Sequence, residues 1–454
     1  MTKYLQYFIV FLPFPFIFNL LRNFSTNNHI NFQSLFFSLF CFSFLYLLGQ
    51  EINKIFQLNS ISLSIVFYLV GMYIFNFVIL PFDKFFLSFV EIFLVYNTVI
   101  TIYLLLKAKN VNKIFIIFGL LIFIRILFNF VDLNNFGYIE YNSDVVEFWK
   151  PMTEKIYNND LFLSINENLI QGYPLMINYT FAQLHYLFIG SSSFAFSLVV
   201  PNLFFFLNIL LIHETIKEPF LKTNVLLIYV SIFLNSDWLS YLFFNSLMGE
   251  VIVNYFFSVF LANAFFNKSI YKNKIYFFCL GFLYFLKPFV SILFLIISFY
   301  FFIKYKKVYS IFLSLVGITV SNIYNVILFS KPDSEIGVIS ENVYFKILLE
   351  NSEKFFNFKT ENINLIIFGE IGIDRVLTLF LIIYIFLSIL NIYHKKTLNI
   401  MNFLFLINLL LVFYLYTTVW KDIELGSAYR YIFSFLTILF IDLGNSYSKV
   451  LKKS

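Results

Sequence analysis

Carboxylate side chains gather in one polar interval, Tyr138 to Gly190, of a chain whose other segments are mostly apolar. A carboxylate close to a reacting hydroxyl can take up its proton as a general base. Asp144 and Glu147 would share a helical face, because residues three apart are neighbours on a helix. We predict that this interval is a reaction loop, within an outer loop 132–190 that carries short surface helices, with Asp144 as its base; the alternative is a solvated loop carboxylate. The carboxylates of the interval are Glu140, Asp144, Glu147, Glu154, Asp160 and Glu167.

A further carboxylate, Glu250, stands between Met248-Gly249 and a long apolar run. An ionised group at membrane depth is unfavourable unless it has a partner or a task. A helix-start carboxylate that interacts with the helix dipole is the structural alternative. If Glu250 is functional, it would hold an acceptor or, together with Asp144, a divalent cation. Two carboxylates without His or Cys suit Mg²⁺ or Mn²⁺.

Two cations have positions suited to a phosphate. Lys287 lies in the middle of an apolar run, directly before Pro288, and Arg430 lies between two tyrosines where the last apolar run begins. Positive groups stabilise a phosphate leaving group, and Arg can contact it with two parallel hydrogen bonds. The alternatives are snorkelling of Lys287 to the headgroups and interfacial anchoring by Arg430. A third cation, Arg125, lies inside an apolar run and must pair or face a cavity.

The composition shows which elements must position these residues. The chain of 454 residues is 60% hydrophobic and 12% charged and contains 69 Phe, so it is more apolar than a soluble domain. Its uncharged runs are long enough to cross a bilayer and lack the period-2 alternation of a barrel. Cys41 and Cys279 lie inside such runs, which indicates neither a disulfide framework nor a metal cluster. We predict an all-α, polytopic membrane protein.

The apolar runs define about fourteen membrane segments, each near the length of about 20 residues that a crossing needs. The run at 274–303 is long, and Pro288 interrupts it, so we predict two helices there. The runs before the reaction loop are at about 4–22, 33–49, 61–80, 84–106 and 113–131. Those after it are at about 192–214, 222–239, 245–266, 274–303, 308–329, 374–393, 399–418 and 428–446.

Lysines indicate the orientation, because basic loops face the cytoplasm. With the 274–303 run divided, the basic connections fall on one side, and both termini are cytoplasmic. The acid-rich intervals 132–190 and 331–373 then face outward. We expect accessory helices in residues 1–112 and a catalytic region in 113–454. The basic connections contain Lys107, Lys109 and Lys113; Lys217 and Lys222; Lys268, Lys272 and Lys274; Lys304, Lys306 and Lys307; Lys395 and Lys396; and Lys449, Lys452 and Lys453.

Four stretches in residues 113–446 resemble the GT-C glycosyltransferases, membrane enzymes that use polyprenyl-phosphate-linked sugars and include protein O-mannosyltransferases and aminoarabinose transferases. In order they are NSDVVEFWKPMTEKIYNND with the later YPLMINYTFAQLHYLFIG, then NSLMGEVIVNYFF, then IYFFCLGFLYFLKPFV, and finally GSAYRYIFSFLTILFI. The positions that match the family pattern are Asp144, Tyr173-Pro174, Glu250, Lys287-Pro288 and Arg430-Tyr431. The family starts its loop after the first helix, whereas here the matching helix is about the fifth.

The resemblance implies an inverting glycosyltransferase at the outer face of the cell membrane. Its donor would be a polyprenyl-phosphate-linked sugar and its acceptor a glycan, a lipid or a protein. We expect Asp144 to be catalytic and Glu147, Tyr173, Glu250, Lys287, Arg430 and Tyr431 to bind substrate. Membrane lipids are the other expected partners, and no nucleic acid is expected.

Two other functions compete with this one. An O-antigen-type polymerase or ligase is favoured where basic residues dominate the outer loops, whereas here these loops are acid-rich. A lipid-linked-oligosaccharide flippase or another transporter predicts internal repeats and charges at the membrane midplane. The large, asymmetric outer loop fits a flippase poorly.

Overall fold

The computed structural model describes helices throughout. In the described part of the chain no strand occurs, so the all-α prediction is confirmed there. The helices fall into two compact units, residues 31–207 with 245–341 and residues 1–30 with 208–244 and 342–454. The predicted division at residue 112 falls inside the first of these units. The described residues are 32–79, 89–107, 110–130, 150–157, 176–190, 199–235, 239, 249–267, 269–283, 286, 288–329, 380–386, 388–389, 400–414 and 435–451.

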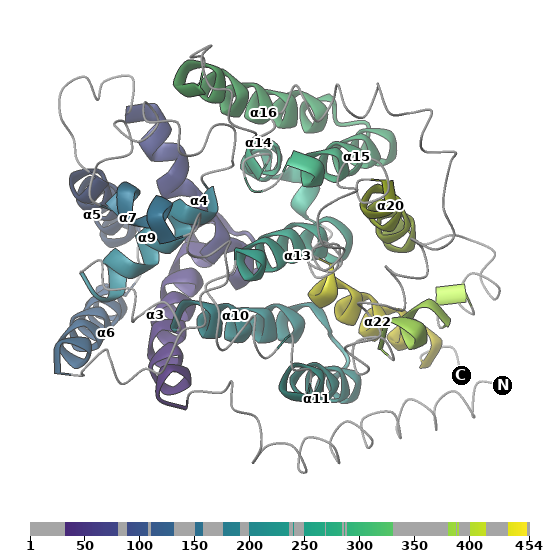
Figure 1. Cartoon of the computed structure of the whole chain (residues 1–454), viewed down its shortest axis with the longest axis horizontal. Helices are drawn as coiled ribbons and strands as arrows, with labels where there is room; N and C mark the ends of the chain where they lie inside the picture. Colours follow the sequence, from purple (N-terminus) through teal and green to yellow (C-terminus); the bar gives the residue numbers. More distant parts are fainter. Residues whose placement is uncertain are drawn as a thin grey trace. The chain divides into compact units, whose positions relative to one another are not determined.

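The larger unit contains most of the helices in Figure 1. Their sequences are long apolar runs, whose backbone groups a helix satisfies internally. The predicted run at 4–22 lies outside the described residues. The helices of this unit are α3 (Phe32–Phe56), α4 (Ile61–Ile79), α5 (Phe89–Lys107), α6 (Val111–Phe130), α7 (Lys150–Tyr157), α9 (Met176–Phe188), the first half of α10 (Val199–Thr215), α13 (Glu250–Phe266), η6 (Ile270–Lys272), α14 (Lys274–Phe282), α15 (Pro288–Tyr305) and α16 (Val308–Phe329).

Three described helices are long and apolar enough to cross a membrane. They span Gln33–Phe56, Phe89–Lys107 and Val111–Phe130. The last two leave large apolar side chains exposed, for example Leu106 at 77% and Phe130 at 86%. Exposed apolar surface on this scale suits contact with lipid rather than water. The chain is therefore a helical, membrane-associated protein, and the count of about fourteen segments stays a prediction.

The predicted interruption of the 274–303 run is confirmed, because α14 ends at Phe282 and α15 begins at Pro288. The ring of Tyr271 stacks on Tyr305 with centroids 4.5 Å apart, and Phe277 meets Phe301 at 5.2 Å. Residue numbers thus rise along one helix while they fall along the other, so the two helices are antiparallel. With nine residues, α14 rises only about 14 Å, less than the hydrocarbon core of about 30 Å.

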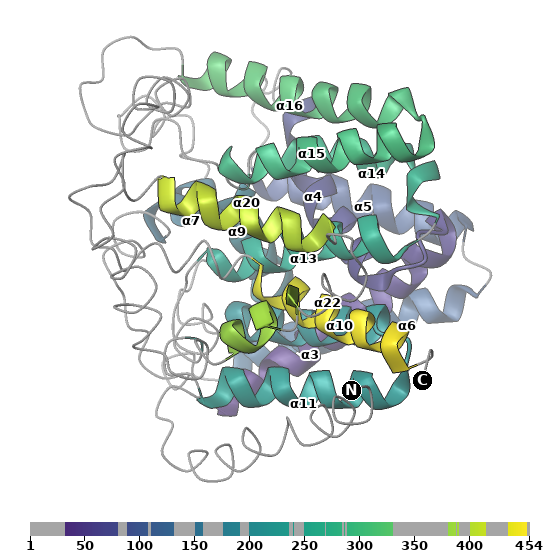
Figure 2. The ribbon, with the colours of Figure 1, turned by 90° about the vertical axis from the view of Figure 1, so that its right-hand side faces the viewer.

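Small residues let α14 and α16 pack backbone to backbone. A Cβ atom added to Gly281 would overlap the carbonyl oxygen of Ser314, and one added to Gly317 would overlap that of Phe278. The hydroxyl of Ser314 donates to the Phe277 carbonyl at 3.1 Å and lies 2.7 Å from the Ser298 hydroxyl of α15. Such close approach and interhelical hydrogen bonding are typical of helix contacts in membranes. Both views show α15 between α16 and α13 (Figures 1 and 2).

The smaller unit is built around aromatic packing on its last helix. Phe440 meets Phe380 at 4.1 Å and Tyr229 at 5.2 Å. A buried carboxylate, Asp442, accepts a hydrogen bond from the Tyr384 hydroxyl at 3.1 Å. The elements of this unit are the second half of α10, α11 (Pro219–Asn235), helical residues between 380 and 389, α20 (Ile400–Tyr414) and α22 (Leu436–Leu451).

Candidate functional site

Of the residues predicted to do chemistry, Glu250 lies in the described part of the chain. The outer interval 331–373 lies outside it, and so does most of 132–175. Within the described residues, no group of three or more His, Cys, Asp or Glu side chains could hold a metal ion. The cation site predicted between Asp144 and Glu250 is only half inside these residues and stays a prediction. The predicted site residues outside the described part are Asp144, Glu147, Tyr173, Lys287, Arg430 and Tyr431.

Glu250 is the first residue of α13 and is only 3% exposed. Its position in the first turn places the carboxylate where the helix dipole favours negative charge. The preceding residue, Gly249, has helical backbone angles, and its carbonyl accepts from the amides of Ile252 and Val253 at 3.1 Å. The buried carboxylate of Glu250 is therefore carried by a first helical turn whose backbone hydrogen bonds are already formed.

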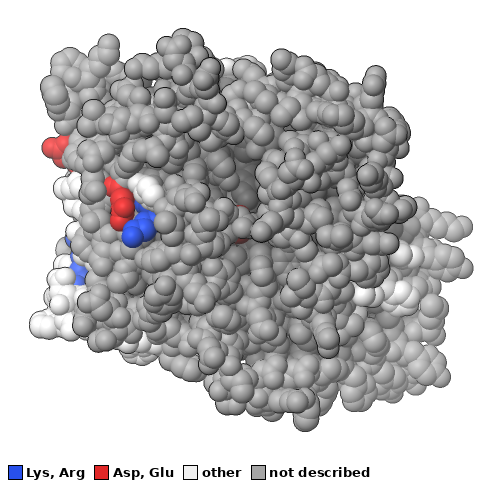
Figure 3. All heavy atoms as spheres, viewed as in Figure 1, with Lys and Arg blue, Asp and Glu red and all other residues white. Residues whose placement is uncertain are grey.

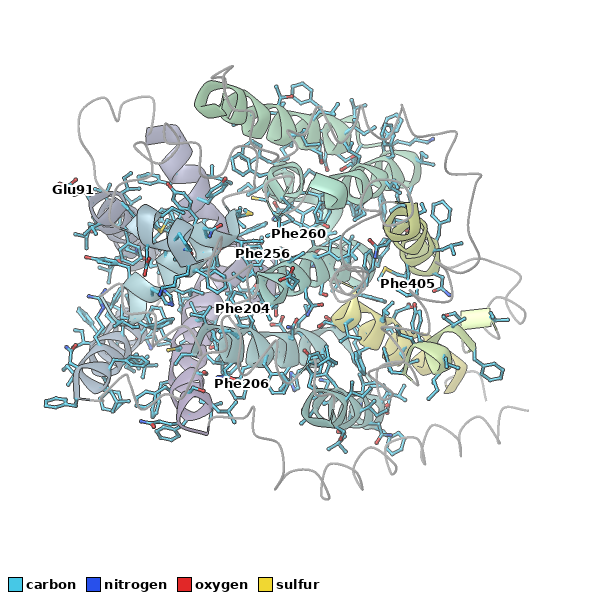
Figure 4. The ribbon with its side chains drawn as sticks, in the orientation of Figure 1. Glu91, Phe204, Phe206, Phe256, Phe260 and Phe405 are labelled. Atoms are coloured by element: carbon cyan, nitrogen blue, oxygen red, sulfur yellow. The ribbon has the colours of Figure 1, made fainter. Side chains whose placement is uncertain are left out.

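The polar face of α13 continues from Glu250 through Asn254 and Ser258. These residues are four apart, so their side chains follow one face of the helix, and all three are buried. Aromatic rings surround this part of the helix: Phe204 of α10 lies 5.6 Å from Tyr255 and 6.4 Å from Phe256 (Figure 4). The stripe therefore places three polar side chains in a line among aromatic rings inside this unit.

Ring contacts fix the height of Glu250 against α15. Phe257 meets Phe294 at 5.4 Å, and Phe265 meets Tyr300 at 5.7 Å. Residue numbers rise together in both helices, so α13 and α15 run parallel with an offset of 35 to 37 residues. This offset places Glu250 level with the beginning of α15, directly after the turn from α14.

Lysine-bearing turns lie at the opposite end of the same helices. The stacking of Tyr271 on Tyr305 brings together the segments around Lys272 and Lys304. On this unit, the basic ends of α14 and α15 are thus separated from the carboxylate by the length of α15. Which membrane face each end occupies stays a prediction.

A second carboxylate, Glu91, offers a comparison. It lies in the first turn of α5 but is exposed, at the left of Figure 4. The last turns of α5 and α13 both lie at the end of α3, because Tyr103 stacks on Phe56 and Asn267 Nδ2 donates to the Leu58 carbonyl at 3.0 Å. Both carboxylates therefore begin helices at the other end of the unit.

Most described charged side chains on the face in Figure 3 lie at its left, where Figure 1 draws α5, α6 and α7.

Two helices come from the predicted reaction loop, and they pack against each other. Asn178 Nδ2 of α9 donates to Thr153 Oγ1 of α7 at 3.3 Å. Every residue of α9 except Tyr186 is buried. The short helix predicted at the surface of the loop is therefore a buried one in α9: Asn178 and Thr180 bond inside the protein, and its tyrosines pack on α4 and α5. Tyr179 meets Tyr73 at 5.1 Å, and Tyr186 meets Phe93 at 4.7 Å.

Arg125 holds the end of α9, and this is the partner that the sequence did not identify. Its Nε donates to the Leu187 carbonyl at 2.9 Å and its Nη2 to the Tyr186 carbonyl at 2.6 Å. The last carbonyls of a helix lack intrahelical donors and carry partial negative charge, so a guanidinium satisfies both needs. Gly190 then ends the helix with a φ of 74°. The helix that leads into the loop thus fixes the helix that closes it.

The imidazole of His185, one turn before this end, is only 1% exposed. Burial lowers the pKa of His185 to about 3, because the protonated ring would lose its hydration. At 13 residues, α9 is too short to cross a bilayer. His185 is therefore a neutral packing residue at neutral pH.

A sequence signal for the Arg125 contact exists in retrospect. A lone Arg inside a lipid-facing helix requires several acceptors, and a helix C-terminus provides them. Phe188-Ile189-Gly190 has the glycine that is typical of such an end.

No family model, curated protein or solved structure matches this chain.

Proposed function

We propose that the protein is an inverting glycosyltransferase that moves a sugar from a polyprenyl-phosphate carrier to an acceptor at the outer membrane face. The observation that supports this most is the buried Glu250 carboxylate. It lies at the beginning of α13, level with the start of α15 and away from the lysine-bearing turns. A buried carboxylate is retained where it has a partner or a task.

In the proposed reaction the acceptor oxygen forms a bond to the anomeric carbon as the bond from that carbon to the phosphate oxygen breaks. Asp144 takes the proton of the acceptor hydroxyl, and polyprenyl phosphate leaves with the bonding electron pair. Lys287 and Arg430 stabilise the charge that develops on the phosphate. Glu250 orients the acceptor or shares a divalent cation with Asp144, and Glu147, Tyr173 and Tyr431 contact the substrates.

The polar stripe of α13 supports the acceptor side of this proposal. Asn254 and Ser258 continue from Glu250 into the protein, so a hydroxyl compound held by the carboxylate would find further polar groups along one line. The rings of Tyr255 and Phe204 beside the stripe suit the apolar face of a sugar. The ordered first turn of α13 would hold the carboxylate in place without reorganisation.

The direct test is an assay of the purified full chain with a panel of polyprenyl-phosphate sugars. We expect release of polyprenyl phosphate with at least one donor and an inverted configuration in the product. Release should require an added acceptor, which distinguishes transfer from hydrolysis. Absence of turnover with every monophosphate donor, together with movement of lipid-linked sugar across protein-containing vesicles, would replace this proposal with a flippase.

A further inference from the structure

Tyrosines and lysines form one continuous surface where the turn before α14 meets the turn between α15 and α16. We name it the tyrosine–lysine surface and define it by Tyr271, Lys272, Lys274, Lys304, Tyr305 and Lys306. At its centre the rings of Tyr271 and Tyr305 are stacked, 4.5 Å apart and inclined by 7°. The hydroxyl of Tyr309 donates to the carbonyl of Tyr271, which ties the two turns together.

The lysines are arranged around this ring pair. Lys272 Nζ lies 5.7 Å from the centre of the Tyr271 ring, and Lys304 Nζ lies 5.2 Å from that of Tyr305. Lys304 also donates to the Tyr300 hydroxyl at 2.6 Å. Lys272, Lys274, Lys304 and Lys306 are all exposed. The ring faces hold the ammonium groups on one side by cation–π attraction, while water or a ligand can reach them.

The backbone at Lys306 adopts the left-handed conformation, which is unusual for a lysine. Lys306 has a φ of 54°, and its amide donates to the Phe302 carbonyl at 2.8 Å to end α15. Glycine or asparagine is the usual residue in this conformation, because a longer side chain is less favoured there. A lysine at this position adds a positive charge between two helix ends.

The charge of this surface is not balanced by its own helices. The sequence from Val251 to Pro332 contains no Asp or Glu. The end of α3 lies nearby, because Asn59 Nδ2 donates to Ser269 Oγ at 2.9 Å, and Glu51 in the last turns of α3 is ion-paired with Lys54. An anionic partner therefore fits the surface by charge.

Apolar side chains directly beside the lysines define that partner further. Ile303 is 65% exposed and Val308 68% exposed, and Ile275 is also more than half exposed. Each is a sequence neighbour, or nearly so, of an exposed lysine. A phosphate group with long alkyl chains matches this combination, since lysines and tyrosines at a membrane interface bind headgroups while apolar groups contact acyl chains.

We propose that the tyrosine–lysine surface is a binding site for the headgroup of an anionic phospholipid. The ammonium groups of Lys272, Lys304 and Lys306 contact the phosphate, and the acyl chains run along Ile303 and Val308. The site lies at the end of α15 opposite to Glu250, so it is separate from the proposed transferase site and does not depend on it.

The test uses the purified full chain in neutral detergent, titrated with dioleoyl phosphatidylglycerol or dioleoyl phosphatidylcholine and followed by native mass spectrometry. The site variant is Lys272→Gln/Lys304→Gln/Lys306→Gln. The matched control, Lys107→Gln/Lys113→Gln/Lys217→Gln, removes the same charge from exposed lysines outside the surface. Each lysine near an anionic surface contributes about fivefold, so the site variant should lose roughly 100-fold in phosphatidylglycerol affinity. The control should retain the affinity of the natural chain.

Equal losses in the two variants would overturn the proposal, because the preference would then depend on total charge alone. Equal binding of both lipids by the natural chain would also overturn it. So would displacement of the lipid by inorganic phosphate, which would make the surface a phosphate site. If the triple variant does not fold, the single variant Lys304→Gln should still lose about fivefold, and unchanged affinity there would contradict the proposal.

Discussion

Arg125 shows how a single residue can make a charge compatible with an apolar helix. Its guanidinium donates to two carbonyls at the end of α9, at 2.9 and 2.6 Å, and lies 5.6 Å from the centre of the Tyr186 ring. Charge-assisted hydrogen bonds are stronger than neutral ones, and planar Arg can contact two acceptors at once. The residue joins two helices through bonds to residues 61 and 62 positions further along the chain.

Replacement of Arg125 by Ala should destabilise the protein by about 2–4 kcal/mol, since two carbonyls lose a charged donor. The amides of α9 should then exchange hydrogen faster, because the helix end is no longer held. Arg125→Lys should recover only part of the loss, as a point charge cannot reach both carbonyls in the same way. Thermal unfolding in detergent and hydrogen exchange over residues 176–190 measure both effects.

The exposed Lys113 on the same helix provides the control. Lys113→Ala removes a positive charge from α6 without touching α9, so its stability and exchange should match those of the natural chain. Identical behaviour of the two Ala variants would mean that Arg125 does not anchor α9.

His185 gives the protein a pH dependence with a definite sign. Its pKa is about 3 when the protein is folded, against 6.5 for an exposed histidine, so the unfolded chain binds more protons between these values. The contribution of neutral His185 to the free energy of unfolding is fully present above pH 6.5. It is lost as the pH falls below 6.5, by up to about 1.4 kcal/mol per pH unit. His185→Gln should flatten the fall of the unfolding temperature between pH 6.5 and 4.5. The exposed His213, changed to Gln, should leave that slope as it is, and equal slopes in all three proteins would exclude His185 as the cause.

Among the elements, α14 and α16 pack closely because Gly281 and Gly317 have no side chain at their contact. Gly281 and Gly317 face each other across the contact, and the Ser314 hydroxyl bonds to the Phe277 carbonyl. Without a hydrophobic driving force between helices in lipid, close backbone packing and hydrogen bonds supply the attraction. The Ser314 hydroxyl, 2.7 Å from that of Ser298, also joins this contact to α15, whose beginning lies level with Glu250.

Gly281→Ala should destabilise the protein by about 1–3 kcal/mol, because the added methyl group overlaps the backbone of α16. Gly119→Ala is the matched control, since a Cβ at Gly119 meets no atom within 4 Å. That change should be neutral or stabilising by up to about 1 kcal/mol, as Ala favours a helix over Gly. Unfolding temperatures of the two variants in the same detergent measure the difference. A Gly281→Ala variant as stable as Gly119→Ala would contradict the packing of α14 on α16.

The helix α9 shows what a sequence pattern does not reveal about a secondary-structure element. Along α9, the polar residues Asn178, Thr180, Gln183 and His185 stand among apolar ones, a composition that resembles that of a surface helix. Their side chains are buried all the same, and Asn178 bonds to a second loop helix. Periodicity reports polarity but not the partner, so a buried polar helix and a surface helix look alike in sequence.

For the whole molecule, the helical class and the membrane-associated character follow from composition and pattern, because apolar runs that lack the alternation of a barrel satisfy their backbone groups in lipid as helices. The break before Pro288 was also predictable, since a proline and a basic loop pattern agreed on it. The aromatic neighbours of α13 were not, because they come from α10 and α15, and their packing depends on contacts far apart in the chain. The partner of Arg125 was missed for the same reason.

The predicted orientation can be tested with single cysteines in intact cells. A cysteine at Asn168 should react with an impermeant thiol reagent from outside, and one at Lys306 should react only after the membrane is opened, because basic turns face the cytoplasm. The natural chain contains only Cys41 and Cys279, which are both buried, so it should remain unlabelled. Labelling of both introduced cysteines from outside would overturn the orientation.

The most direct test of the account concerns Glu250, whose carboxylate we place in the substrate site. Glu250→Gln keeps the volume and removes the charge, and Glu91→Gln makes the same change in the exposed first turn of α5. The measurement is kcat/KM for release of polyprenyl phosphate, with the unfolding temperature of each variant recorded beside it. We predict a loss of roughly 10–100-fold for Glu250→Gln, the value of one charged hydrogen bond, at nearly unchanged stability, and no loss for Glu91→Gln. Equal turnover in the two variants, or a loss for Glu250→Gln that follows only its unfolding temperature, would contradict the account.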